Sequence, residues 1–153
     1  SPEGGAFLFG KDKGGDEYYQ SYRFDLKDGT ITQFSDPGSR NGSGLWSDDG
    51  SLVAWARTNA GDPNNDILIG NPADPASVRV ALEGEGAIGP VDWSADGKTL
   101  VLQRYKSIAK SHIYSLDVAT GTLTEFNAGD DVAYSGAALL ADGSVLTVTD
   151  KDS

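Results

Sequence analysis

The stretch Trp93-Ser94-Ala95-Asp96-Gly97, followed by the apolar run 99–102, decides the fold of this chain. It predicts a strand that ends in tryptophan, a tight Asp-Gly turn, and a second strand that runs back beside the first. The same phrase occurs at residues 46–50, where Trp46, Asp49 and Gly50 hold the corresponding places. We therefore interpret the turn as part of a repeat.

Weaker copies of the phrase occupy residues 1–4 and 140–143, and the second copy contains Asp142 and Gly143. The column formed by Ser1, Ser47, Ser94 and Leu140 has successive separations of 46, 47 and 46 residues. A period near 46 residues is typical of the four-stranded blades of β-propellers.

The agreement between units extends beyond the Asp-Gly turn. Residues 25–34 align with residues 117–126 at a constant offset of 92, so that Asp117 and Gly121 match Asp25 and Gly29. An aspartate that opens a turn accepts bonds from backbone N–H groups ahead of it, and glycine supplies the positive φ that follows. We interpret these residues as structural positions of the repeat.

Short β-branched and apolar runs between Gly-containing turns predict an all-β chain with no sustained helical periodicity. Residues 106–110 form at most one helical turn. The thirteen predicted strands are residues 5–12, 18–26, 30–34, 43–47, 52–58, 66–70, 77–82, 88–94, 99–105, 112–117, 122–127, 132–140 and 144–149.

Grouped by the repeat, these strands predict a partial β-propeller of four-stranded antiparallel blades. The approximate blades are residues 1–41 without a first strand, 42–87, 88–131, and 132–153 with the first two strands only. About 3.3 repeats are fewer than the roughly four to eight blades that close a ring. We therefore expect a piece of a longer propeller, which we favour because both ends fall within repeats, or a chain that assembles with its copies through open sheet edges.

Composition excludes several classes of protein. Hydrophobic residues at 38% and charged residues at 23% are typical of soluble globular chains. A net charge of −11 disfavours nucleic acid and anionic membrane surfaces as partners. The chain has no Cys, which leaves no disulfide, thiolate metal site or thiol nucleophile. It has no Met even at position 1, so we expect a processed, cut or subcloned chain, and no apolar run is long enough for a membrane span.

The pattern Trp-Ser-x-Asp-Gly-x-x-Leu, followed after a loop by Ile-Tyr-x-x-Asp-x-x-Thr-Gly, resembles the WD-type blades of TolB-like propellers. It also resembles the N-terminal propeller of prolyl oligopeptidase-type serine peptidases, including the dipeptidyl-peptidase and acylaminoacyl-peptidase branches. Residues 93–100 and 113–121 carry the resemblance, which covers nearly the whole chain. The third unit, with residues 104–107, and the ending 148–153 look more like the peptidase group than like TolB.

In such peptidases the propeller lies over a separate C-terminal α/β-hydrolase domain that holds a Ser-Asp-His triad. The resemblance therefore implies a non-catalytic propeller that shapes or gates the access of peptide substrates, with the rest of the ring and the hydrolase domain as partners. It implies no catalytic residue and no cofactor in this chain. The alternatives are a TolB-like propeller that acts through protein–protein contacts and a self-assembling fragment. Exported relatives favour a periplasmic or otherwise exported location over the cytoplasm.

Two patterns resemble catalytic or nucleotide-binding motifs but do not complete them. No serine has glycine at both −2 and +2, as a nucleophile elbow requires, and the only histidine, His112, is interpreted as an ordinary strand residue. Residues 84–89 match Gly-x-Gly-x-x-Gly, yet Pro90 and a strand follow instead of the helix that would bind a pyrophosphate. We interpret residues 84–89 as a turn between blades.

The remaining candidates concern cations, sugars and aromatic stacking. Asp62, Asn64 and Asp66 have the 1, 3, 5 spacing of oxygen ligands for Ca²⁺, but the Gly and Glu that an EF-hand loop needs next are missing. Residues 41–43 fit the glycosylation sequon, although Asn-Gly also favours a tight turn, which is our interpretation. The three tryptophans, which could stack on a ligand, are interpreted as packing residues because Trp46 and Trp93 repeat.

Overall fold

The computed structural model describes residues 1–151 and consists of short antiparallel strands in four sheets. The first sheet has the order β1-β2-β3, and the last pairs β13 with β14. Their bounds are Ala6–Lys11 (β1), Gln20–Asp25 (β2), Ile31–Gln33 (β3), Tyr134–Leu139 (β13) and Val145–Thr149 (β14). Asp152 and Ser153, which end the predicted fourth blade and the peptidase-like ending, lie outside the described residues.

The two middle sheets are complete blades. The third sheet has the order β12-β11-β10-β9, and in the second β6, β7 and β8 follow one another while β4 and β5 both pair with β6. The bounds are Ser39–Asn41 (β4), Leu45–Trp46 (β5), Val53–Asn59 (β6), Asn65–Gly70 (β7), Arg79–Leu82 (β8), Ala87–Trp93 (β9), Thr99–Ser107 (β10), Lys110–Asp117 (β11) and Leu123–Glu125 (β12).

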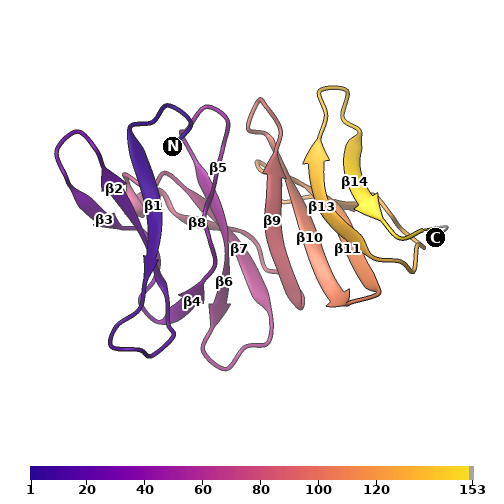
Figure 1. Ribbon diagram of the computed structural model, residues 1–153, viewed down its shortest axis with the longest axis horizontal. Helices are drawn as coiled ribbons and strands as arrows, with labels where there is room; N and C mark the ends of the chain where they lie inside the picture. Colours follow the sequence, from indigo (N-terminus) through magenta and orange to yellow (C-terminus); the bar gives the residue numbers. More distant parts are fainter. Residues whose placement is uncertain (152–153) are drawn as a thin grey trace.

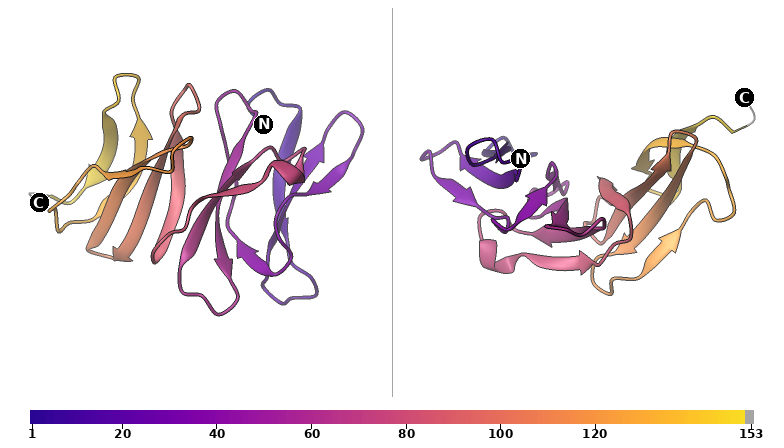
Figure 2. Two further views of the ribbon diagram at one scale, coloured as in Figure 1. Left: turned by 180° about the vertical axis from the view of Figure 1, so that it is seen from behind. Right: turned by 90° about the horizontal axis from the view of Figure 1, so that it is seen from below.

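The four sheets stand side by side in chain order, as Figure 1 shows. Seen from below, they follow an open arc with the N-terminal and C-terminal sheets at its two ends, and β3, β8 and β12 lie on the outer side (Figure 2). The arrangement confirms the predicted all-β partial propeller. We call the sheets blades 1 to 4 in this order.

The repeated turn has one geometry in all four blades. A glycine N–H donates to the carbonyl three residues back, from Gly50 to Ser47, Gly97 to Ser94, Gly143 to Leu140 and Gly4 to Ser1, each at 2.9 Å. These glycines have φ of 68°, 68°, 84° and 72°, a region that a side chain disfavours. The column that the sequence predicted is therefore a column of turns that share this hydrogen bond and a glycine with positive φ.

The second predicted register also holds. Gly29 N donates to Asp25 O at 2.9 Å, and Gly121 N donates to Asp117 O at 2.8 Å. Further along, the backbone N–H of residue 21 donates to the side chain of residue 35, and that of residue 113 donates to the side chain of residue 127, each at 2.8 Å. The offset of 92 thus extends beyond residues 25–34.

Three local predictions differ from the structure. The first strand of blade 2 begins before residue 43, because β4 pairs with β6, so the blade begins before the expected boundary at residues 41 and 42. The strand expected from residue 77 is preceded by a 3-10 turn, Pro75–Ser77, capped by Asp74. Residues 106–110 have no helical turn, because they form the tip of the β10–β11 hairpin.

Two hydrophobic clusters hold the blades together. The larger joins blades 2 and 3 and consists of Ala54, Ile67, Ile69, Ile88, Trp93, Leu100, Leu102, Tyr114 and Leu116. The smaller joins blades 1 and 2 and consists of Phe34, Val53, Trp55 and Leu68, with Leu8, Trp46 and Val78 at its border. No helix within residues 1–151 is long and apolar enough to span a membrane.

Candidate functional site

Each blade turns one face of its sheet toward the preceding blade, and we call this the leading face; the opposite one is the trailing face. Side chains along a strand alternate between the two faces of its sheet. When one residue packs in the cluster on one face, the residues directly before and after it in the strand therefore point to the other face. On the leading faces of blades 2 and 3 lie Val53, Trp55, Leu68, Leu100, Leu102, Tyr114 and Leu116, all of which are at most 7% exposed.

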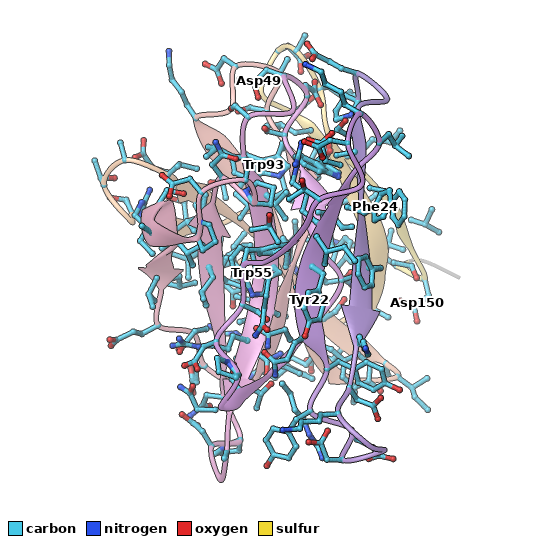
Figure 3. All side chains as sticks on the ribbon, turned by 90° about the vertical axis from the view of Figure 1, so that its left-hand side faces the viewer. Tyr22, Phe24, Asp49, Trp55, Trp93 and Asp150 are labelled. Carbon is cyan, nitrogen blue, oxygen red and sulfur yellow. The ribbon has the colours of Figure 1, made fainter. Side chains whose placement is uncertain are left out.

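The leading face of blade 1 carries the corresponding side chains, but no other blade within residues 1–151 covers it. Leu8 packs toward blade 2, so Phe7 and Phe9 point the other way, and they stack on Phe24 and Tyr22 at ring separations of 5.0 Å and 5.2 Å. Phe7 is 46% exposed. Figure 3 views the molecule from this end, with Tyr22 and Phe24 labelled. We call these four residues the aromatic end face.

The trailing face of blade 4 is the second uncovered surface. Leu146 and Val148 are 63% and 70% exposed, whereas Val101, which holds the place of Leu146 in blade 3, is fully buried. Gln103, two residues after Val101, donates to the carbonyl of Tyr134 in blade 4, which shows that this face of blade 3 is covered. Both ends of the arc therefore expose apolar positions that are buried between blades elsewhere.

A cavity lies beside the inner edge of β1. It has a volume of about 320 Å³ and lies between blades 1 and 2. Its lining consists of Leu8, Phe9 and Gly10 of β1, of Tyr19, Ser21 and Phe34, and of residues 41–44 from the end of β4 to the start of β5. Gly44 is required there, because a Cβ on it would lie 2.7 Å from side-chain carbons of both Leu8 and Val53.

His112 lies in β11, on the side that faces blade 2. Its Nδ1 lies 2.6 Å from Glu125 Oε1, and within residues 1–151 it makes no hydrogen bond to a serine hydroxyl. Beside it, Arg104 donates to Glu85 at 3.3 Å and lies over the ring of Tyr114 at 5.0 Å. Burial is the main cause that raises the pKa of the Tyr114 hydroxyl. The group is an ionic and aromatic contact, without the nucleophile that acyl transfer requires.

Arg104 has an equivalent in blade 2. Arg57 occupies the same place in β6 and donates to Asp66 at 2.6 Å. The side chains of Arg57 and Arg104 are 16% and 14% exposed, and the buried Nε of each has no hydrogen-bond partner. An acidic side chain pairs with each of the two arginines. We therefore interpret Arg57 and Arg104 as structural ion-pair residues at the same position of blades 2 and 3.

The candidate calcium ligands have protein partners. Asp62 accepts from Asn64 N at 2.9 Å, the Asn64 side-chain oxygen accepts from Gly86 N at 2.8 Å, and Asp66 accepts from Arg57. No group of three or more His, Cys, Asp or Glu residues that could hold a metal occurs within the described part of the chain. The loop joins β6 to β7 within blade 2, and the Asn64 side chain ties it to Gly86, just before β9.

Residues 83–86 join β8 to β9 and thus form the connection between blades 2 and 3, whereas residues 87–89, which were expected in the same turn, already belong to β9. Asn65 N donates to Gly86 O at 3.1 Å, which ties the connection to the loop before β7. A Cβ on Gly84 would lie 2.0 Å from the carbonyl oxygen of Asn65. Close packing against a backbone explains the first glycine of the motif.

The tryptophans and Asn41 belong to the contacts between blades. Trp93 is 3% exposed and donates to Leu45 O at 3.1 Å, while Trp55 is fully buried and donates to Asn41 Oδ1 at 3.0 Å. Trp46 borders the cluster between blades 1 and 2. The tight turn predicted at Asn41 is wrong, because Asn41 ends β4 and its side chain also donates to Tyr19 O at 3.1 Å.

The repeated aspartates are the groups whose pKa the fold shifts most regularly. The Ser51 backbone N–H, with the hydroxyls of Ser47 and Ser51, lowers the pKa of Asp49. The Ser94 hydroxyl is the main cause that lowers the pKa of Asp96, and Thr120 and Ser144 have the same effect on Asp117 and Asp142. Each carboxylate is held ionised by donors of its own turn, which is a structural role.

Sequence reasoning expected open edges but did not identify the aromatic end face. The available signal was positional: Phe7 and Phe9 lie 46 residues before Val53 and Trp55, the same spacing as the Asp-Gly turns. An uncovered surface can thus be identified from residues that match buried positions of the repeat but lie in a blade with no blade before it.

Neither a protein-family model nor a curated protein sequence matches the chain. Solved structures do match. TolB from Acinetobacter baumannii is 14% identical with a TM-score of 0.71 over 97% of this chain and 37% of its own. Oligogalacturonate lyase from Vibrio parahaemolyticus is 14% identical with a TM-score of 0.71 over 98% and 44%.

A third similar structure is the propeller domain of the Trilobed protease from Pyrococcus furiosus, which has an open velcro topology. It is 19% identical to this chain with a TM-score of 0.57, over 81% of this chain and 40% of its own. The chain spans less than half the length of each of these proteins. At such low identities the similarities show the fold, a partial propeller of the kind found in TolB and in protease propellers.

Proposed function

We propose that this chain forms part of the propeller of a prolyl oligopeptidase-type serine peptidase, where it shapes and gates the access of peptide substrates to an α/β-hydrolase domain. The observation that carries the proposal is the pair of uncovered end faces on a regular array of blades. The aromatic end face exposes 46% of Phe7, at a position that is fully buried as Val53 and Leu100 in the next two blades. Such faces suit further blades of the same ring.

Two further observations support a non-catalytic role. The only histidine bonds to Glu125 instead of a nucleophile. Most of the aspartates that could be taken for catalytic groups belong to the repeated turns. The similarity to a protease propeller and the family resemblance of the blade motifs favour a peptidase. That resemblance also favours an exported location, which fractionation of the source cells tests.

The reading frame that contains this chain tests the peptidase assignment. We expect a downstream Gly-x-Ser-x-Gly followed by Asp and His in the order of an α/β-hydrolase. A fluorophosphonate probe should label that serine in the whole protein and should leave residues 1–153 expressed alone unlabelled. Several hundred following residues without the motif would contradict the proposal.

Substrate size tests the gating role in the whole protein. A propeller that restricts access predicts rapid cleavage of a short peptide and little cleavage of the same sequence placed in an exposed loop of a folded protein. An unfolded carrier of the same sequence serves as the control for accessibility of the bond. Equal rates for the peptide and the folded carrier would show an ungated site.

A second candidate function is a TolB-like propeller that acts only through protein–protein contacts. The TM-score of 0.71 with TolB over 97% of this chain favours it. The reading frame distinguishes it, because such a protein lacks the hydrolase motif. Light scattering of the isolated chain tests the remaining alternative, in which copies assemble through their end faces; a strict monomer excludes that alternative.

A further inference from the structure

Arg40 differs from the other arginines of the chain because its guanidinium has no polar partner within residues 1–151. The side chains of the other four contact a carboxylate or a backbone carbonyl: Arg23 with Asp25, Arg57 with Asp66, Arg104 with Glu85, and Arg79 with Val118 O. The Arg40 guanidinium instead lies over the ring of Tyr18, with 5.3 Å between its carbon and the ring centroid. A guanidinium held on an aromatic face keeps its N–H donors available for a planar anion.

The repeat does not require an arginine at this place. Arg40 pairs with Thr58 in blade 2. In blade 3, Ala87 pairs with Tyr105, which lies 47 residues after Thr58. Ala133, 46 residues after Ala87, holds the corresponding place in blade 4. Two blades thus have a methyl group where blade 2 has an exposed arginine, so the packing of a blade does not explain Arg40.

A pocket of about 230 Å³ opens beside Arg40, between blades 1 and 2. Its walls are Tyr18, Arg40, Thr58 and Asn59, and residues 60–62 of the loop after β6. The β1–β2 and β6–β7 loops lie at the same end of the molecule, the lower end in Figure 1. Pockets for drug-sized ligands usually have roughly 300–1,000 Å³, so this one fits a single side chain or the end of a chain.

The pocket does not arise from the unpaired edge of β1, because β1 contributes no residue to its walls. The corresponding place between blades 2 and 3, which are both complete, is formed by the same kinds of segment. There the end of the β6–β7 loop meets the start of β9, and Asn64 Oδ1 accepts from Gly86 N at 2.8 Å. Between blades 1 and 2, the end of the β1–β2 loop meets β4, and Asn41 N donates to Tyr19 O at 3.1 Å.

A carboxylate fits these walls best. The planar guanidinium presents parallel N–H groups that match the two oxygens of a carboxylate. Asp62 also lines the pocket, and its charge disfavours a dianion such as phosphate. The net charge of −11 repels anions in general, so binding depends on the direct contact with Arg40.

Asn59 adds an acceptor beside this cation. Its Nδ2 donates to Asp66 Oδ2 at 3.4 Å, while its side-chain oxygen has no hydrogen-bond partner within residues 1–151. In a peptide the terminal carboxylate is adjacent to an amide N–H, which this oxygen can accept. The pocket therefore offers a donor pair for a carboxylate and an acceptor for the neighbouring amide.

We propose that Arg40, Tyr18 and Asn59 form a binding site for a peptide carboxylate. Arg40 binds the two oxygens, Tyr18 holds the guanidinium in place, and Asn59 accepts from the amide next to the carboxylate. The carboxylate is the end of a peptide chain, or the side chain of an Asp or Glu in a peptide. The inference uses no hydrolase domain, so its failure would leave the peptidase proposal unchanged.

NMR titration of the isotope-labelled chain with acetyl-Ala-Ala-Ala tests the site. The peptide should shift the backbone amides of residues 58–62 and the Arg40 Nε–H signal, with a Kd of about 1 mM. The same peptide with a C-terminal amide should bind at least about tenfold more weakly, because it lacks the carboxylate. Acetyl-Ala-Glu-Ala-amide distinguishes the two sources: tighter binding than that of the free acid assigns the site to acidic side chains, and weaker binding assigns it to chain ends.

Substitutions at Arg40 and Tyr18, with a matched control, test the role of each side chain. Arg40→Gln should weaken binding at least about tenfold, and Arg40→Lys about threefold, because an ammonium does not present two parallel donors. Tyr18→Leu should weaken binding about threefold, whereas Tyr18→Phe keeps the ring and should bind as the parent does. Lys27→Gln removes the same charge from the exposed β2–β3 turn and should leave binding unchanged. The dispersion of each spectrum shows that the variant is folded.

Four outcomes would overturn the proposal. They are no shift at residues 58–62 in about 20 mM peptide, equal binding of the acid and its amide, equal losses for Arg40→Gln and Lys27→Gln, and binding of inorganic phosphate as tight as that of the peptide. Equal losses in the two charge variants would mean that net charge alone attracts the peptide. Tight phosphate binding would mean that the site selects charge instead of the carboxylate group.

Discussion

Phe9 in blade 1 and Trp55 in blade 2 hold the same place in the repeat, but their surroundings differ. Trp55 is fully buried, meets Phe34 edge-on at a ring separation of 5.1 Å, and donates to Asn41. Phe9 stacks on Tyr22 and also meets Phe7 at a ring separation of 6.1 Å, and both partners belong to its own sheet. Identical sheet geometry thus gives a core position in one blade and a surface position in the other, because burial in a propeller comes from the neighbouring blade.

The comparison separates the interactions that form within one blade from those that require a neighbouring blade. Neighbouring strands pair within each sheet, and the Asp-Gly turns of blades 2, 3 and 4 form within their own sheets, including the two-stranded sheet of blade 4. The leading face of a blade, in contrast, is buried only by the blade that precedes it. Mutations of leading-face residues should therefore have different effects in different blades, whereas mutations within the turns should have similar effects in each.

Trp55→Ala should have the largest effect. Removal of a fully buried tryptophan leaves a cavity between blades 1 and 2 and should cost about 3–5 kcal/mol of the free energy of unfolding. Phe9→Ala, the matched variant in blade 1, loses mainly one stacked ring and should cost about 1–2 kcal/mol. Denaturant melts measure both values.

Equal losses at the two positions would contradict this comparison, because they would mean that the aromatic end face is covered in solution. Repeating the melts at several protein concentrations identifies such covering, since association makes stability depend on concentration. Trp93→Ala, which removes a buried tryptophan from the cluster between blades 2 and 3, should fall in the range of Trp55→Ala.

Gly84→Ala should have the next largest effect, at the connection between blades 2 and 3. The added Cβ would lie 2.0 Å from the Asn65 carbonyl oxygen, so the backbone must shift, at a cost of about 1–3 kcal/mol. Gly89→Ala is the control, because its Cβ meets nothing within 4 Å, and its effect should stay within about 0.5 kcal/mol. Thermal or denaturant melts in which both variants behave alike would exclude the close approach at Gly84.

Lowering the pH should weaken the repeated turns of blades 2, 3 and 4 alike. Asp49, Asp96, Asp117 and Asp142 have lowered pKa values in the folded chain. Such groups stabilise the fold above their unfolded pKa, and this contribution is lost as the pH falls from about 5 through the lowered folded values. NMR titration should place each of these carboxyl groups below its usual range near pH 4. A turn aspartate that titrates at the usual value would show that its turn is open in solution.

The turns, strand order and blade count were predictable from the sequence because they depend on local chemistry that recurs every 46 residues. An aspartate followed by glycine predicts the positive φ that the structure has at Gly50 and Gly97. The split of the first strand in blade 2 was not predictable, because Asn41 looks like a turn residue and only Trp55 and Tyr19, distant in sequence, use its side chain. The uncovered faces likewise depend on which blades are adjacent.

The three repeated turns that contain Asp-Gly, at Gly50, Gly97 and Gly143, also affect how the protein ages. A glycine after an aspartate leaves its backbone nitrogen unobstructed for attack on the aspartate side-chain carbonyl, the step that leads to isoaspartate. In the folded turn of blade 2 the Gly50 N–H donates to Ser47 O, and the Asp49 carboxylate is held by Ser47 and Ser51. The reaction therefore requires the turn to open. The lifetime of the Asp-Gly bonds becomes a record of how often each turn of the array unfolds.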